Sequence, residues 1–434
     1  MHTLRITLII SLLTLLAVSS AHAVMAGAAK AEITPDPAKY RVQLAGYGAR
    51  MGKPATGIHD PLHAKVLVLK DGGRLSAGGR LLALVTCDLR SITPELKRLL
   101  IEKVAALGLS ADNVFMSASH THSGPAMFAE RFWQMQFGKY DPAIVENMSA
   151  AIAKAVAEAV ASAAPVKVAF AETTAAGFAQ NRRWEYDTDA RVAAGESPLI
   201  NESLWLMRLD KQDGSTLAVL SHFATHPTIL GADNMLVSAD WPGAFQREME
   251  NQFPGAVALF MNGAEGDQAP KGAQGDDAFV RVEDFGSRLA QIAATAAKNL
   301  TPRNELVFSC ARKMIPLPEF NFPQQAKEKF AKYLDAAMEA LPREVELQAV
   351  LLGDTLLVGL PGEPLMAAGN EVKKTVQGFG CVLAVGLAND YIGYIVTPAE
   401  WAHGGYEVES RSYYGPNLAG HLATQAAEIV SSLK

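Results

Sequence analysis

The sequence predicts an α/β protein: a single large domain with mixed β-sheets flanked by helices. Two observations support this fold class. Apolar runs rich in Val and Leu alternate with segments whose apolar residues recur at helical spacing. The 434 residues also contain no internal repeat, no low-complexity tract and no clear linker. A hydrophobic content of 49% is enough to build one large core.

The first 23 residues predict a signal peptide rather than a folded element. Arg5 supplies a positive charge, Ile6 to Val18 form an apolar segment, and Ala21-His22-Ala23 fits a cleavage site. The apolar segment is short for a bilayer span, and no later segment approaches ~20 apolar residues. We therefore expect a mature chain that begins near Val24 and has no stable transmembrane segment. We also expect it to be exported, either to the periplasm or out of the cell.

Strand-like runs dominate the first part of the mature chain. His63 to Lys70 and Arg80 to Asp88 predict two strands, and Asn113 to Met116 predicts a third. Pro94 to Leu107 has apolar residues at helical spacing and stops at Gly108, so it predicts a helix. A strand, a helix and a strand in this order form the typical unit of an α/β fold.

Strands and helices continue to alternate toward the C-terminus. The predicted strands are Val166 to Glu172, Leu204 to Leu209, Thr216 to Phe223, Ala256 to Met261, Glu305 to Arg312, Glu344 to Leu351, Thr355 to Leu360 and Cys381 to Leu387. The predicted helices are Tyr140 to Ala163, a segment ending near Asn251, Glu283 to Leu300, Gln324 to Leu341, a segment beginning at Leu365, and Asn417 to Leu433. A Lys-Gln-Asp-Gly turn at 211–214 predicts a hairpin. We expect the polar stretch from Gln180 to Pro198 to be irregular, and a Gly- and Tyr-rich stretch from Gly404 to Pro416 leads to the last helix.

Charge and cysteine content exclude several classes of function. The formal net charge is -6, and no basic patch is present to neutralise phosphates, which argues against a nucleic acid partner. The cysteines are Cys87, Cys310 and Cys381, and an odd number leaves at least one of them free. No C-x-x-C motif occurs, so we set aside a redox site and a thiolate metal site. Whether any disulfide forms stays open.

Two histidines separated by one residue, His120 and His122, follow the strand predicted at 113–116. In an extended backbone, residues two apart point the same way, so both imidazoles can face one pocket. Neutral imidazole is the commonest side-chain metal ligand, which makes the pair a candidate for metal binding or acid–base chemistry. The alternative is that both are loop histidines facing solvent. Gly124-Pro125 then turns the chain.

Three further strand ends carry groups that can bind a metal. They are His226 before Pro227, Glu363 in a Pro-Gly-Glu-Pro turn, and the pair Tyr391 and Tyr394. Two histidines and one carboxylate form a common catalytic zinc set, and in α/β folds binding groups gather at strand ends. We therefore expect a metal site at strand ends. Each group also has an ordinary structural role open to it, and His222 competes with His226 as a ligand.

Several motifs then occur in an order that is familiar from one protein family. They are Gly57-Ile58-His59-Asp60, His120-Thr121-His122-Ser123-Gly124-Pro125, Asn181-Arg182, His226-Pro227-Thr228, Gly362-Glu363, Asn389-Asp390-Tyr391-Ile392-Gly393-Tyr394, Tyr406-Glu407 and Tyr414-Gly415-Pro416. Together they resemble the neutral/alkaline (non-lysosomal) ceramidase family over nearly the whole mature chain.

The resemblance implies a zinc-dependent amidohydrolase that cleaves the amide bond of N-acylsphingosine into a fatty acid and an amine. It implies that Zn²⁺ is held by His120, His226, Glu363 and Tyr394. It implies that the substrate amide is surrounded by His122, Arg182 and Tyr406. In the mechanism that follows, zinc-bound hydroxide attacks the carbonyl carbon. His122 protonates the leaving amine, and Tyr406 helps to stabilise the oxyanion.

The chain differs from the family pattern in three respects. Family members carry an additional C-terminal β-sandwich domain, whereas residues 24–434 resemble the catalytic domain alone. Ala269 stands before Pro270 where the family has a serine, and Trp241-Pro242 replaces a polar pair after Asp240. These differences disfavour a serine nucleophile, favour metal-activated water, and leave the substrate open.

Three functions are therefore compatible with the sequence. The first is hydrolysis of a ceramide-type N-acyl lipid, with transient contact to a membrane surface. The second is hydrolysis of another amide or ester at the same zinc site. The third is a non-catalytic zinc-binding module. A Ser-His-Asp hydrolase is disfavoured because no G-x-S-x-G motif is present. The oligomeric state is not specified by the sequence.

Overall fold

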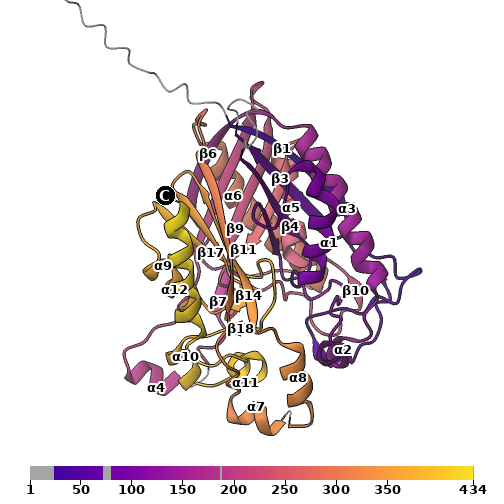
Figure 1. The fold of residues 1–434 in the computed structure, drawn as a ribbon, viewed down its shortest axis with the longest axis vertical. Helices are drawn as coiled ribbons and strands as arrows, with labels where there is room; N and C mark the ends of the chain where they lie inside the picture. Colours follow the sequence, from indigo (N-terminus) through magenta and orange to yellow (C-terminus); the bar gives the residue numbers. More distant parts are fainter. Residues whose placement is uncertain (1–23, 72–79, 186–187, 330, 434) are drawn as a thin grey trace, which may run out of the picture.

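The computed structural model describes residues 24–71, 80–185, 188–329 and 331–433. The predicted signal peptide, residues 1–23, lies outside the described residues. Two β-sheets pack against each other at the centre, and helices cover their outer faces (Figure 1). The predicted α/β class with mixed sheets flanked by helices is confirmed.

The larger sheet of the described chain has eight strands in the order β11-β9-β8-β6-β1-β3-β4-β5. In chain order these strands are β1 (Met25–Glu32), β3 (His63–Lys70), β4 (Leu81–Cys87), β5 (Val114–Ala118), β6 (Ala164–Thr174), β8 (Ser203–Lys211), β9 (Thr216–Phe223) and β11 (Val257–Asn262). The outermost pair at each edge is parallel, and the pairs between them are antiparallel. The predicted hairpin is β8–β9, and the predicted strand–helix–strand unit is β4, α1 (Pro94–Val104) and β5.

The smaller sheet has four strands in the order β13-β14-β15-β17. They are β13 (Phe308–Pro316), β14 (Glu344–Leu352), β15 (Thr355–Gly359) and β17 (Cys381–Val385). Three short pairs lie beside the main sheets: β2 (Gly57–Ile58) with β10 (Leu236–Val237), β7 (Ala179–Asn181) with β12 (Gln268–Pro270), and β16 (Glu363–Pro364) with β18 (Tyr394–Ile395). The last pair is parallel and places Glu363 opposite Tyr394.

Alternate residues of the central strands enter different cores. In β3, Leu67 and Leu69 pack in the core between the two sheets, whereas Val66 and Val68 face the helices. Side chains of a strand alternate between its two faces, so a strand covered on both faces is apolar throughout. This double burial explains why the predicted strands are continuous apolar runs rather than alternating patterns.

Helices cover the outer face of each sheet. The larger sheet is covered by α1 and α3 (Pro142–Ala161) beside β1 and β3, and by α5 (Asp240–Gln252) and α6 (Ala278–Lys298) beside β6, β8 and β11. The smaller sheet is covered by α9 (Met366–Thr375) and α12 (Leu418–Val430). Figure 1 shows α1 and α3 on one side of the strands and α9 and α12 on the other. Among the described residues, no helix combines the length and apolarity needed to cross a membrane.

Two predicted segments are wrong. The single helix expected from Gln324 to Leu341 is divided into α7 (Gln324–Lys329), a 3-10 turn (Ala331–Tyr333) and α8 (Leu334–Ala340). These pieces pack against different partners, α7 against α11 (Tyr406–Arg411) and α8 against α2 (Arg131–Phe137), which one straight helix could not do. The stretch from Gln180 to Pro198, expected to be irregular, contains α4 (Thr188–Ala193). Short helices of this kind are stabilised by tertiary packing rather than by their own sequence.

The three cysteines are free in the structure. Cys87 is buried, as expected, while Cys310 and Cys381 are half-buried. No disulfide therefore links any of the three positions, and the fold depends on its packed cores.

Candidate metal centre and active site

Three buried histidines meet where strands of the larger sheet end. His120 and His122 follow β5, and His226 follows β9. One ring nitrogen from each lies within 4.8 Å of the others. The Nε2 atoms of His120 and His122 are 3.2 Å apart. The predicted pair therefore shares one pocket, and His226 joins it from more than 100 residues away.

The orientation of two of these rings is fixed by backbone carbonyl groups. His120 Nδ1 lies 2.7 Å from the Arg90 carbonyl oxygen, and His226 Nδ1 lies 2.7 Å from that of Glu265. A carbonyl oxygen only accepts hydrogen bonds, so each Nδ1 must carry the proton and each Nε2 has a free lone pair. His226 Nε2 is buried without a hydrogen-bond partner in the described chain. This is the arrangement of metal-binding imidazoles, in which an acceptor hydrogen-bonded to the other ring nitrogen fixes the tautomer.

The backbone at His120 differs from the expected extended strand. His120 has a φ of 77°, in the left-handed region, and its N–H donates a 2.8 Å hydrogen bond to the Leu89 carbonyl. A non-glycine residue there costs of order 1 kcal/mol or more and persists only where surrounding contacts hold it. His120 and His122 therefore converge because of a strained turn, not because of strand alternation.

Glu363 brings a carboxylate to the same point. Its Oε2 lies 3.2 Å from His120 Nε2 and 3.4 Å from His226 Nε2. The approach depends on Gly362, because a Cβ at that position would lie 2.4 Å from the Gly393 carbonyl oxygen. The turn that the sequence marks with Pro-Gly-Glu-Pro thus allows β16 to lie against β18.

Two side chains hold the other carboxylate oxygen of Glu363. Tyr391 donates its hydroxyl to Oε1 over 2.6 Å, and Arg90 Nη2 lies 3.2 Å from the same oxygen. The sequence singled out Tyr391 only as a strand-end tyrosine and missed Arg90 altogether. Arg90 lies three residues beyond Cys87, the end of β4, so the strand-end rule that identified the other groups could have found it.

Burial and neighbouring charges set the protonation of this cluster. Burial lowers the pKa of His226 to about 3, and it lowers the pKa of His122 well below 6.5. Burial alone would raise the pKa of Glu363, but His120, His226 and Arg90 outweigh it and hold that pKa well below 4.5. A neutral His226 beside an ionised Glu363 is the protonation pattern needed to bind a cation.

Tyr394 and Arg182 form a second group beside the histidines. Arg182 Nη2 donates to the Tyr394 hydroxyl over 2.9 Å, and Arg182 Nε donates to Glu407 over 2.8 Å. Tyr406 lies farther out, half-exposed, with its ring centroid 6.2 Å from that of Tyr394. Arg182 and Tyr394 are thus joined directly, whereas Tyr406 lies at the edge of the site.

His222, which the sequence offered as an alternative to His226, does not join the histidine cluster. Its Nε2 lies 2.9 Å from the Ala384 carbonyl oxygen in the smaller sheet.

Glu265, by contrast, lies within the site, fully buried, and neither of its carboxylate oxygens has a hydrogen-bond partner in the described chain. Burial and the nearby Glu363 charge raise its pKa well above 4.5. Glu265 is not among the residues that the sequence predicted for the site.

A cavity of about 440 Å³ opens next to His122. Its lining includes Gly46, Tyr47, Met135 and Tyr406. The Tyr47 ring packs edge-on against His122 at 4.7 Å between centroids. A Cβ at Gly46 would lie 2.4 Å from His122 Cγ, so glycine is needed for this close approach. His122 is thus separated from this cavity only by its contacts with the lining residues Gly46 and Tyr47.

The donor set fits a divalent cation such as Zn²⁺. His120 and His226 direct lone pairs toward the carboxylate of Glu363, and one of those nitrogens is a buried atom without a partner. Two histidines and one carboxylate are a standard catalytic zinc set. His122 Nε2 is close enough to compete as a third nitrogen.

Comparison with known proteins points to the same family that the sequence motifs resemble. Residues 24–312 match the family described as neutral/alkaline non-lysosomal ceramidase, N-terminal. A neutral ceramidase from Mycobacterium tuberculosis is 24% identical, with 90% of this chain and 74% of that protein covered. A neutral ceramidase from Pseudomonas aeruginosa is 23% identical, with 90% of this chain and 69% of that protein covered.

The fold is similar to solved ceramidases. The crystal structure of the Pseudomonas aeruginosa neutral ceramidase superposes with a TM-score of 0.82 at 21% identity, covering 95% of this chain and 74% of that chain. A ceramidase complexed with C2 gives a TM-score of 0.80 at 20% identity, covering 95% and 75%. Because the family match spans most of the described residues, the chain belongs to the neutral/alkaline non-lysosomal ceramidase family.

Proposed function

We propose that the protein is an exported, zinc-dependent hydrolase that cleaves the amide bond of an N-acyl lipid such as ceramide. The observation that carries this proposal is the convergence of His120, His226 and Glu363. Glu363 Oε2 lies 3.2 Å from His120 Nε2 and 3.4 Å from His226 Nε2. Membership of the ceramidase family supplies the reaction class, since its named members are neutral ceramidases.

In this proposal His120, His226, Glu363 and Tyr394 hold the zinc ion. The parallel pairing of β16 with β18 supports the inclusion of Tyr394, because it places Tyr394 directly opposite Glu363. When bound, zinc would lower the pKa of a water molecule to ~7 and polarise a carbonyl oxygen. Arg90 and Tyr391 would keep the Glu363 carboxylate in one orientation.

His122 would transfer the proton that the leaving amine needs. Its Nδ1 is buried without a hydrogen-bond partner in the described chain, and the ring packs against Tyr47, which lines the cavity. Because burial keeps the ring neutral, His122 can accept a proton at a ring nitrogen and then deliver it to the nitrogen of the leaving amine. That nitrogen must be protonated before it can leave as an amine.

Arg182 and Tyr406 would surround the substrate amide. Arg182 is fixed by Glu407 and by the Gly266 carbonyl oxygen, so its guanidinium would keep the Tyr394 hydroxyl in place. Tyr406, at the outer edge of the cavity, can donate its hydroxyl to a carbonyl oxygen that develops negative charge. An ordered donor of this kind stabilises the transition state more than the ground state.

Water rather than a side chain would be the nucleophile. Ala269 lies on β12, paired with Gln180, and offers no hydroxyl at the position where the sequence comparison expected a serine. A covalent acyl-enzyme through this position is therefore unavailable to the chain. This difference also favours a second candidate, hydrolysis of a different amide or an ester at the same centre.

The lining of the cavity near His122 is suited to an amphipathic substrate. Phe132 and Met135 line it, and a chain of methylene groups gains ~0.8 kcal/mol for each CH₂ removed from water. Met135 and Tyr406 are both partly exposed at its edge, which suits transient contact with a membrane surface while a lipid enters. Export to the periplasm or beyond rests on residues 1–23 of the sequence.

A product screen tests the proposal. The mature chain, residues 24–434, would be incubated with ceramides, N-acyl amino acids, N-acyl sugars and simple esters. We expect release of a fatty acid and an amine from a ceramide, loss of turnover with a chelator, and recovery with added zinc. Turnover of an ester or another amide alone would select the second candidate. Binding of zinc without turnover of any substrate would leave a non-catalytic zinc module.

A further inference from the structure

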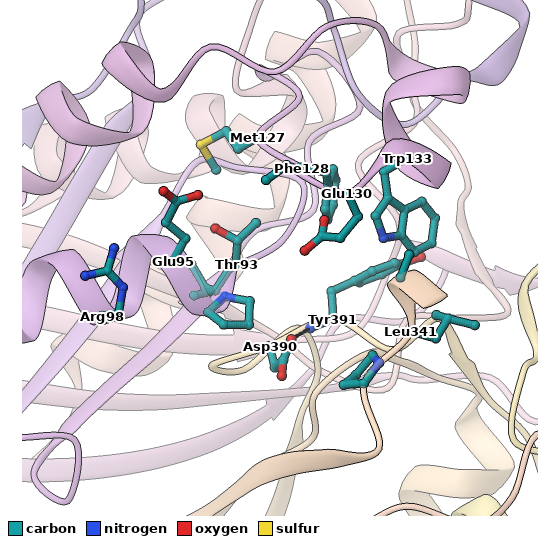
Figure 2. Close-up of a pocket in the computed structure, with 15 residues that line it drawn as sticks. Thr93, Glu95, Arg98, Met127, Phe128, Glu130, Trp133, Leu341, Asp390 and Tyr391 are labelled. Atoms are coloured by element: carbon teal, nitrogen blue, oxygen red, sulfur yellow. Dashed lines mark hydrogen bonds between the residues drawn. The ribbon is translucent and has the colours of Figure 1, made fainter. Parts of the chain in front are cut away.

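A second cavity, of about 420 Å³, lies beside Tyr391. Its walls come from the start of α1, the segment leading into α2, residues 340–342 and the Asp390-Tyr391 turn (Figure 2). It shares no lining residue with the cavity next to His122. Helix α2 separates the two, because Trp133 lines the second cavity and Met135 lines the first. The second cavity is thus a separate volume large enough for a small organic molecule.

Among the described lining residues of this cavity, carboxyl groups outnumber cations. Glu95, Glu130 and Asp390 line it, and within that described set Arg98 is the one basic residue. Arg98 pairs instead with Glu102 over 2.6 Å at the exposed surface of α1. Glu95 accepts a hydrogen bond from the Tyr140 hydroxyl. In Figure 2, Glu95 and Arg98 lie at one end of the cavity, and Trp133 and Tyr391 lie at the other.

Asp390 is the buried member of this group. Its side chain is only 8% exposed, and within the described chain its carboxylate accepts one hydrogen bond, from the adjacent Tyr391 N–H over 2.7 Å. Burial, together with the charges of Glu346 and Glu130, raises its pKa to about 7. A buried carboxylate with so few partners is costly, and a cation from outside would remove that cost.

The remaining walls are aromatic and apolar. Phe128 and Trp133 pack with their centroids 5.3 Å apart, and Trp133 lies 5.8 Å from Tyr391. Met127 and Leu341 complete this side. Arg90 already lies over the Phe128 and Tyr391 rings. Arg411 lies over the Trp133 ring, so these walls are suited to the apolar part of a ligand rather than to its charge.

We propose that this cavity binds a small alkylammonium ion. Its charged nitrogen lies between Asp390 and Glu130, and its alkyl part packs against Trp133 and Leu341. A neutral ligand, such as a sugar, would stack on the same aromatic rings but would leave Asp390 without a counter-ion. The proposal stands independently of the proposed hydrolase activity, because none of the three clustered histidines lines this cavity.

Titration calorimetry of the full mature chain at pH 8 tests the proposal, with hexylammonium chloride as the probe and 1-hexanol as the neutral probe of matched size. We expect hexylammonium to bind at least about tenfold more tightly than hexanol, because only the cation meets the carboxylates. We expect Asp390→Asn to weaken hexylammonium binding about tenfold and Glu130→Gln to weaken it several-fold.

Two controls make the result specific. Glu339→Gln removes one negative charge from an exposed position on α8 next to the cavity wall, and it should change binding less than about twofold. Glu130 is exposed, so its substitution should leave folding intact even if Asp390→Asn does not fold. Equal binding of hexanol and hexylammonium, absence of binding to the unmodified protein, or tight binding that Glu130→Gln leaves unchanged would each overturn the proposal.

Discussion

The Tyr391 hydroxyl donates a 2.6 Å hydrogen bond to Glu363 Oε1, and it thereby connects the cavity that Tyr391 lines with the candidate metal centre. Burial raises the pKa of this hydroxyl well above 10, so it stays protonated and can only donate to the carboxylate. The opposite oxygen of Glu363 is left to face His120 and His226. One tyrosine therefore determines which carboxylate oxygen is available to a metal.

Replacing Tyr391 with phenylalanine should weaken zinc binding. Loss of an outer hydrogen bond to a ligand typically costs 10–100-fold in metal affinity, so we expect an increase in Kd of about tenfold or more. Competition with a chromophoric chelator measures this constant. Tyr413→Phe is the matched control, because the buried Tyr413 hydroxyl has no hydrogen-bond partner in the described chain and its loss should leave zinc affinity unchanged. Equal affinities for both variants would contradict a positioning role for Tyr391.

His120→Ala and His122→Ala should differ in their zinc content. His120 is fixed by the Arg90 carbonyl with its lone pair toward Glu363, so its loss should abolish stoichiometric zinc binding and activity. His122 would handle the proton, so its loss should keep about one zinc per chain and lower kcat by roughly 10²–10⁴-fold. Elemental analysis of the purified variants measures the zinc bound per chain and so distinguishes the two roles. A zinc-free His122→Ala protein would show that all three histidines are ligands.

Gly46→Ala should impair catalysis while zinc remains bound. Gly46 has a φ of 93°, and a Cβ there would lie 2.4 Å from His122 Cγ. The ring must move, and a misplacement of ~1 Å can cost up to 10²-fold in rate. The left-handed backbone should also cost about 1–3 kcal/mol of stability. Gly48→Ala provides the control, since nothing lies within 4 Å of a Cβ at that position. Steady-state kinetics and thermal unfolding of both variants test this.

Glu250→Gln should remove a pH-dependent part of the stability. Burial would raise the pKa of Glu250, but Lys65 at 2.7 Å and Lys30 at 2.6 Å hold it below 4.5. A lowered carboxyl pKa contributes stability above the unfolded value, and that stability is lost as the pH falls through the folded value.

At pH 7 the variant should therefore be less stable by about 2–3 kcal/mol, because the buried Lys65 loses its counter-ion. The difference should shrink as the pH is lowered below 4.5. Urea unfolding between pH 3 and pH 8 measures it. Glu248→Gln, on the same helix but hydrogen-bonded only to amide side chains, should show little of this trend. A pH-independent difference would mean that the ion pair is not responsible.

Much of the fold could be predicted because it follows from local patterns. Within the strand predicted from His63 to Lys70, residues 66–69 are all apolar because both faces of β3 are covered there, and the segment became the strand expected. The helix from Gln324 to Leu341 could not be predicted correctly, because its two halves are held by different neighbours. Periodicity reports which residues are buried, but it does not report what buries them.

The sequence by itself determined that His120, His122, His226 and Glu363 lie at strand ends, where turns rich in Gly and Pro follow apolar runs. Only the tertiary structure decided that these turns meet, that a left-handed backbone at His120 brings His122 alongside, and that Arg90 and Tyr391 hold Glu363. The physical reason is that a strand end is a local property of the chain. A shared pocket requires three separate turns to pack together, and side chains remote in sequence fix that packing.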